Sequence, residues 1–151
     1  MKLKIKKSLT ADTRSCDYKT VSKETLLKST HQHIGDVQQA MQHFSKLILR
    51  AGAVHDRTKV EKIDDFHKGF VGGFEDTSWL DMHVTEERHH ITTKEPEDID
   101  LIDVLEYIAD TSMAAMGRSG KYMSEDLAEG LLKKAFDNTL RKMLEVIEVE
   151  K

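Results

Sequence analysis

The chain of 151 residues contains little that would cross-link it, interrupt its helices or anchor it in a membrane. Its one cysteine, Cys16, cannot close an internal disulfide, which favours a reducing compartment. With one proline and eight glycines, long helices can run without interruption. No apolar run approaches a membrane span, and the basic start Met1–Lys7 is not followed by the apolar part of a secretory signal. We therefore expect a cytoplasmic protein with no membrane partner.

Further absences exclude several classes of function. A net charge of -4 argues against stable nucleic-acid binding. The sequence has no glycine-rich phosphate loop and no His-Glu-x-x-His element of a zinc protease, and its few aromatic residues are as well explained by a core as by base stacking. Cys16 lies in a polar segment that looks unstructured, so it is a poor candidate nucleophile. Histidine is what the chain has in quantity: there are eight, all between His31 and His90.

Hydrophobic periodicity predicts an all-α fold. Apolar residues recur at steps of three and four, as on one face of an amphipathic helix. The pattern predicts about five helices, at 22–52, 55–69, 78–90 (capped by Ser78), 96–116 and from Ser124 through Ile147. Residues 1–21 alternate lysine with apolar residues and then become polar, which predicts a short N-terminal arm or strand. We expect a single compact helical bundle over residues 22–151 behind that arm.

The first candidate site residues lie on the first two predicted helices. His33 falls on the apolar stripe of the first helix, where a buried imidazole needs a partner. His55 and Asp56 are adjacent near a predicted helix start, from which both side chains can reach one cation. An imidazole and a carboxylate together suit several divalent ions. Lys59 lies one turn further on, where its ammonium could hold a phosphate oxygen.

A second group of candidates lies on the third and fourth predicted helices. His83 and His90 are seven residues apart, which places them on one face of a helix, and His89 is offset by one position. Such histidine pairs can build a metal site, although a charged, solvated helix fits the same segment. Asp110 is followed by small and apolar residues, and a carboxylate in such surroundings needs a partner, such as a cation. Glu106 precedes it by one turn.

The order of these residues resembles the HD-domain phosphohydrolases. His55-Asp56-Arg-Thr-Lys59 looks like the HD-x-x-K element of that family, and Ile-Ala-Asp110 looks like its closing aspartate segment. His83, His89 and His90 are similar to the additional histidines of the two-metal branch, which includes the HD-GYP phosphodiesterases. The residues after His90 are Ile-Thr-Thr, so the Gly-Tyr-Pro element is missing. The segments around His33 and Asp110 are also similar to a small HD-like family of bacteria and their phages, so the expected compartment is the host cytoplasm if a phage encodes the chain.

The resemblance implies an HD-like bundle with one or two divalent ions, of Mn, Fe, Zn, Mg or Ni. It assigns a first ion to His33, His55, Asp56 and Asp110. It assigns a second ion to His83, His89 and His90, with Asp56 as the bridge. Catalysis would then use metal-activated water, Lys59 on the phosphoryl group, and Glu106 as an outer support or proton acceptor.

Three functions follow from this implied site. The first is hydrolysis of a nucleotide, as a phosphomonoester or a deoxynucleoside triphosphate. The second is a phosphodiesterase acting on a cyclic or linear dinucleotide. The third is a non-catalytic protein that binds metal or nucleotide and regulates. In each case the expected partner is a small phosphate ester, and a homo-oligomer is compatible with all three.

Overall fold

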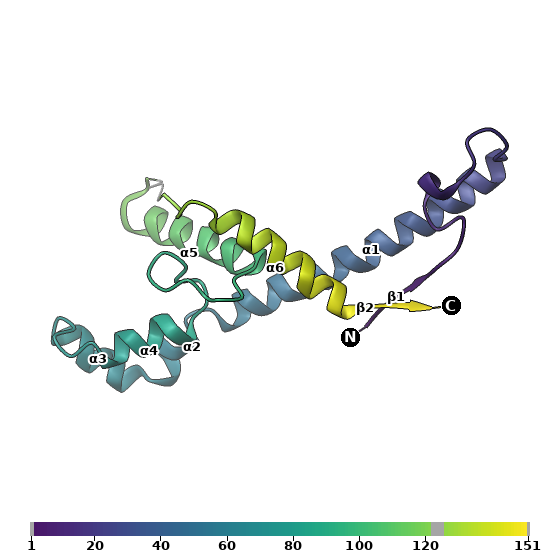
Figure 1. Cartoon of the computed structure of the whole chain (residues 1–151). Helices are drawn as coiled ribbons and strands as arrows, with labels where there is room; N and C mark the ends of the chain where they lie inside the picture. Colours follow the sequence, from purple (N-terminus) through teal and green to yellow (C-terminus); the bar gives the residue numbers. More distant parts are fainter. Residues whose placement is uncertain (1, 122–125, 151) are drawn as a thin grey trace. The chain divides into compact units, whose positions relative to one another are not determined.

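The computed structural model describes residues 2–121 and 126–150, and over these the chain is mostly helical (Figure 1). This confirms the predicted all-α class with a short N-terminal strand. The elements in chain order are β1 (Leu3–Lys6), a 3₁₀ turn η1 (Thr13–Ser15), α1 (Lys23–Val54), α2 (Arg57–Glu61), α3 (Ile63–Val71), α4 (Ser78–Glu86), α5 (Leu101–Ser119), α6 (Leu131–Val146) and β2 (Ile147–Glu150). Within the described residues, no helix is both long and apolar enough to cross a membrane.

The chain divides into two compact units, Met1–Lys46 with Arg141–Lys151, and Leu47–Leu140. Helices α1 and α6 each contribute to both units. The predicted boundary, between an arm (1–21) and a helical domain (22–151), stays a prediction.

The first unit pairs the two ends of the chain. Strand β1 lies parallel to β2 with Leu3 opposite Ile147, and Leu3 is buried. Both strands alternate apolar and charged residues, and the lysines of β1 stand opposite the glutamates of β2. Lys4 lies opposite Glu148 and forms a diagonal ion pair with Glu150 at 3.2 Å. The prediction that the last helix includes Ile147 is therefore wrong. Ile147 begins a strand, because β-branched residues in alternation favour strand pairing once a complementary partner is present.

The second unit contains the core that holds the functional segment. Buried apolar side chains from the loop after α4, from α5 and from α6 form one cluster: Ile91, Ile99, Val104, Tyr107, Leu131 and Ala135. Arg88 adds a polar clamp, since its guanidinium donates two hydrogen bonds of 2.7 Å to the buried carboxylate of Asp103 on α5. The loop that carries His89 and His90 is thus fixed by apolar packing on one side and by a bidentate ion pair on the other.

Several predicted helix boundaries in this unit are wrong for identifiable reasons. Helix α4 ends at Glu86 rather than His90, because Glu87 turns to extended geometry. Helix α5 begins at Leu101 rather than near Pro96, because the Asp100 side chain accepts from the backbone of Ile102 and Asp103 in a capping box.

Two further boundaries also differ from the prediction. The predicted helix 55–69 is two helices, α2 and α3, separated at Lys62. Gly52 lies inside α1 instead of ending it. The predicted cap at Ser124 lies outside the described residues, and α6 begins at Leu131 after Gly130 with φ of 82°.

Candidate metal centre

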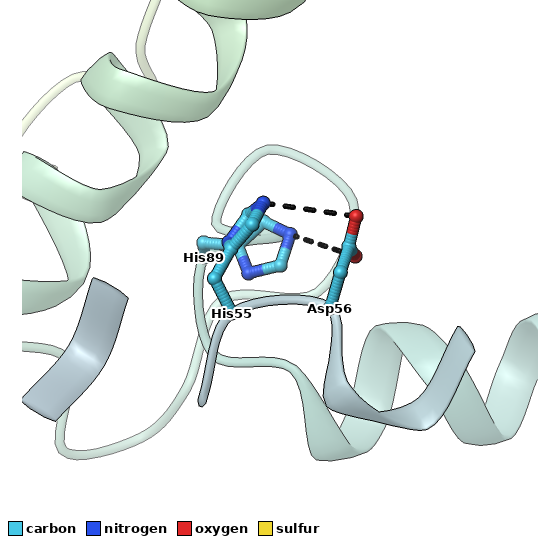
Figure 2. A group of neighbouring side chains, drawn as sticks. All are labelled: His55, Asp56 and His89. Atoms are coloured by element: carbon cyan, nitrogen blue, oxygen red, sulfur yellow. Dashed lines mark ion pairs between the residues drawn. The ribbon is translucent and has the colours of Figure 1, made fainter. Parts of the chain in front are cut away.

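The junction between α1 and α2 brings two adjacent side chains to one point. Helix α1 ends at Val54, and Asp56 adopts a left-handed backbone with φ of 54° before α2 begins. Aspartate is one of the few non-glycine residues that tolerate this region. The resulting turn places His55 Nε2 3.6 Å from Asp56 Oδ2, and the two side chains converge with His89 in Figure 2. The turn thus lets the adjacent side chains of His55 and Asp56 face one point, which a continuous helix would not allow.

Three further histidines come from α4 and the loop after it. His83 is buried on α4, and Trp79, one turn earlier, stacks on its ring at 4.8 Å between centroids. His89 is buried in the loop, and His90 places its Nε2 atom 2.9 Å from His83 Nε2. At most one of these two facing nitrogens can carry a proton in the contact, so at least one lone pair points at the other ring.

Asp56 belongs to two groups that could hold a metal ion. The first group is His55, Asp56 and His89, and the second is Asp56, His83 and His90; within each, the ligand atoms lie within 4.8 Å of one another. Asp56 Oδ1 lies 3.5 Å from His83 Nε2 and 3.7 Å from His89 Nε2. These separations are long for hydrogen bonds. They are close to the roughly 3.4 Å that separates two ligands bonded at about 2.1 Å to one tetrahedral ion.

The buried oxygen of Asp56 supplies an independent test of whether a metal fits. Asp56 Oδ1 is buried without a hydrogen-bond partner among the described residues, and buried carboxylate oxygens are normally satisfied. The Nε2 atoms of His83 and His89 both face this oxygen. A cation could bind both this unpaired oxygen and the lone pairs of the histidine nitrogens that face it. The residues present therefore fit a divalent ion.

The protonation states of Asp56, His83 and His90 suit a cation. Burial lowers the pKa of His83, and burial together with the neighbouring His89 and His83 rings lowers the pKa of His90 to about 4. Burial acts to raise the pKa of Asp56, but Lys59 and the nearby histidines outweigh it and hold that pKa below its ordinary value. At neutral pH the His83 and His90 rings are therefore neutral and Asp56 is ionised, as metal ligands must be. Burial acts to lower the pKa of His89, but Glu106, Asp56 and Asp110 outweigh it and raise that pKa, so metal binding at this ring competes with a proton.

Glu106 on α5 supports two of the histidines from behind. Its Oε1 atom lies 3.0 Å from His55 Nδ1, in a hydrogen bond, and 3.2 Å from His89 Nδ1. Because this one oxygen lies beside the Nδ1 atoms of both rings, the Nε2 atom of each ring faces Asp56. Burial acts to raise the pKa of Glu106, but the two rings lower it, so this group is held as a carboxylate.

Thr58 and Glu87 also support the centre, and neither was among the site residues predicted from the sequence. The Thr58 hydroxyl lies 2.7 Å from His83 Nδ1, and the Thr58 backbone N–H donates to Glu87 Oε1 at 2.8 Å. Glu87 therefore satisfies a free N–H in the first turn of α2 while α4 ends at the same residue. The only sequence signal was the position of Thr58 between Asp56 and Lys59, since the partner of each group comes from a distant part of the chain.

The structure brings most of the remaining candidates to the centre. Asp110 Oδ1 lies 3.4 Å from His55 Nε2, and Lys59 Nζ donates to Asp56 Oδ2 at 2.5 Å. His33 belongs to the first unit, where its half-exposed ring is 3.4 Å from Asp12 Oδ2, and its assignment to the first ion stays a prediction. The grouping of the histidines also differs from the expected one, because His89 joins His55 rather than His83 and His90.

Glu106→Gln is expected to weaken metal binding roughly tenfold to a hundredfold, the usual cost of losing the partner of a ligating histidine. The amide keeps the size of the side chain but lacks the negative charge that lies 3.0 Å from His55 Nδ1 and 3.2 Å from His89 Nδ1. The measurement is a titration of metal-free protein with Zn²⁺ or Mn²⁺ in competition with a chelator. Glu97→Gln, at an exposed site, is the matched control. Equal affinity in both variants would show that Glu106 has no supporting role.

His90→Ala is expected to lower the metal content from two ions per chain to one. His90 belongs only to the second group, whereas His55 and His89 complete the first group without it. Elemental analysis after loading and gel filtration gives the count, with the exposed His67→Ala as the control. A wild-type count of one that His90→Ala leaves unchanged would mean that the centre holds a single ion without His90.

The chain was also compared with known proteins. No protein-family model, curated protein or solved structure matches it. The assignment of function therefore depends on the chemistry of the centre itself.

Proposed function

We propose that this chain is a metal-dependent phosphoric ester hydrolase of the HD type. The observation that carries the proposal is that Asp56 is shared by two histidine groups while Lys59 reaches the same carboxylate. A pair of neighbouring cation sites with an ammonium beside them suits a phosphoryl group, which carries negative charge on several oxygens. The resemblance in the sequence agrees with this chemistry, through His55, Asp56, Lys59 and Asp110.

Each residue of the centre then has a defined task. Divalent ions held there would supply Lewis-acid stabilisation of the phosphoryl group and a water nucleophile usable at neutral pH. Asp56 holds the two positions together, and the histidines complete them. Glu106 acts as a positioning residue, because its Oε1 atom is engaged by His55 and His89. Lys59 places its ammonium where negative charge accumulates as the ester is cleaved.

The reaction consumes one water molecule. A bond forms between the water oxygen and phosphorus, and the bond from phosphorus to the organic oxygen breaks. The departing alkoxide takes up a proton, so the products are an alcohol and inorganic phosphate. For a dinucleotide the same bond changes release a nucleoside monophosphate.

The test is a substrate screen with Mn-loaded protein and product analysis. The panel contains nucleoside mono- and triphosphates, cyclic and linear dinucleotides, and simple alkyl and aryl phosphates. Release of inorganic phosphate supports a phosphomonoesterase, and release of nucleoside monophosphate supports the phosphodiesterase alternative. Bound metal without turnover of any of these esters would contradict the proposal and favour a binding protein.

A further inference from the structure

An apolar pocket opens beside the candidate metal centre, entirely within the second unit. It has a volume of about 440 Å³, and His55, Glu106 and Asp110 form part of its wall. The remaining wall is apolar and comes from α1 and α5, with Ile48, Leu105 and Met113 among its side chains. That volume lies within the range of small-molecule sites. A group bound in the pocket would therefore contact the same His55 and Asp110 that face Asp56.

The charges of the pocket limit what can enter it. No lysine or arginine is among its described lining residues, and its acidic members are Glu106 and Asp110. Phosphates of a nucleoside triphosphate that extend beyond the metal centre would meet carboxylates there, without a lysine or arginine of the wall to compensate their charge. Apart from His55, the lining also has no aromatic ring on which a nucleobase could stack. The pocket thus disfavours both the additional phosphates and the base of a nucleotide.

A neighbouring cavity does not change this conclusion. Arg50, Arg57 and Arg88 line it together with Glu106, but it contains none of the five residues of the two metal groups. Arg88 is bound to Asp103 and Asp98, and Arg57 pairs with Glu61 at 3.4 Å. Two of its three arginines are therefore already neutralised by carboxylates of the chain.

We infer that the substrate is a phosphate monoester whose organic group is largely apolar, aliphatic or aryl, and carries no further phosphate. The inference rests on the proposed function, because the pocket supplies specificity to that same centre. The apolar group would lie against Ile48, Leu105 and Met113, and the phosphoryl group would lie at Asp56 and Lys59. Burying exposed apolar surface on both partners would then provide much of the affinity.

Binding of inert analogues tests the pocket separately from catalysis. Alkylphosphonates lack the cleavable ester bond, so calorimetry with Mn-loaded protein reports affinity alone. Along the series from ethyl to octyl, affinity is expected to rise roughly fourfold per added methylene, the effect of burying one CH₂ group. An affinity independent of chain length would overturn the inference, even if metal binding and hydrolysis were both intact.

Two substitutions on α5 locate the effect. Met113 lines the pocket and is 74 % exposed, whereas Met116 is 51 % exposed and is not part of the lining. Met113→Glu is expected to reduce octylphosphonate affinity at least tenfold with metal content unchanged, and Met116→Glu is expected to leave it unchanged. Circular dichroism confirms that both variants fold. Equal effects of the two substitutions would overturn the inference.

Two other outcomes would also overturn it while leaving the proposed function in place. One is a higher kcat/KM for a nucleoside mono- or triphosphate than for octyl phosphate. The other is a dimer that forms in wild type, dissociates in Met113→Glu and excludes octylphosphonate, which would make a second copy of the chain the occupant. Failure of the proposed function itself would look different, as a protein without metal or without turnover of any ester.

Discussion

Asp56→Asn is expected to lower metal affinity by a hundredfold or more and to abolish hydrolysis. Loss of an outer-shell partner already costs about tenfold to a hundredfold, and Asp56 belongs to both groups of candidate ligands. Asparagine is the informative replacement because it also tolerates the left-handed backbone found at this position, with φ of 54°. The substitution therefore removes the charge without forcing the α1–α2 turn to change. Elemental analysis and a steady-state rate on the same preparation give both results.

The matched control for this prediction is Asp64→Asn, at an exposed position on α3. It changes the net charge by the same amount and is expected to leave metal content and rate at the wild-type level. Thermal unfolding of metal-free protein should be similar for both variants. Full metal content in Asp56→Asn would contradict the assignment of Asp56 as the shared ligand.

Lys59→Ala is expected to retain the metal but to lower kcat by roughly a hundredfold or more, the scale seen when one electrostatic donor to a transition state is removed. Lys59 Nζ donates to Asp56 Oδ2, so its ammonium already lies at the centre. Its contribution should be largest in the transition state, where phosphoryl oxygens carry the most charge, and KM should change less than kcat. The measurement is a metal assay and a full rate curve on the best substrate of the screen.

Lys62→Ala is the control for the lysine. Lys62 lies three residues further on and pairs with Glu86 at 3.4 Å, outside both metal groups. Its removal is expected to change kcat by less than about twofold, as for an ordinary surface ion pair. If Lys59→Ala loses the metal, the lysine maintains the site rather than the reaction, and the assignment of a catalytic role is wrong.

Helix content was predictable because it depends on local periodicity, and helix ends were not, because they depend on partners elsewhere. The stripe of α1 was visible in the sequence, but its extension past Gly52 was not, since a single glycine costs only about 1 kcal/mol in a helix. Glu87 ends α4 where its carboxylate binds the backbone of Thr58 on α2. No local pattern in the sequence contains that contact.

In the candidate centre, too, the residues could be predicted from local sequence, but their contacts could not. The candidates between His55 and Asp110 were found from residue type and order, and the structure brings them together in the second unit. Their pairing was not predictable, because a loop held by Arg88 and the apolar core, not a helix face, sets the directions of His89 and His90. His33 differs in one respect. Its place on an apolar stripe suggested burial, whereas its ring is half exposed beside Asp12 in the first unit, and its assignment to the metal stays a prediction.

The central claim is that Asp56 and the histidines around it hold divalent metal. It is tested most directly by elemental analysis of the purified wild-type chain, as isolated and after loading with Mn²⁺ or Zn²⁺ followed by gel filtration. The two groups that share Asp56 predict close to two ions per chain after loading, and fewer than one in Asp56→Asn. Wild-type protein that retains no metal after loading with either ion would contradict the account.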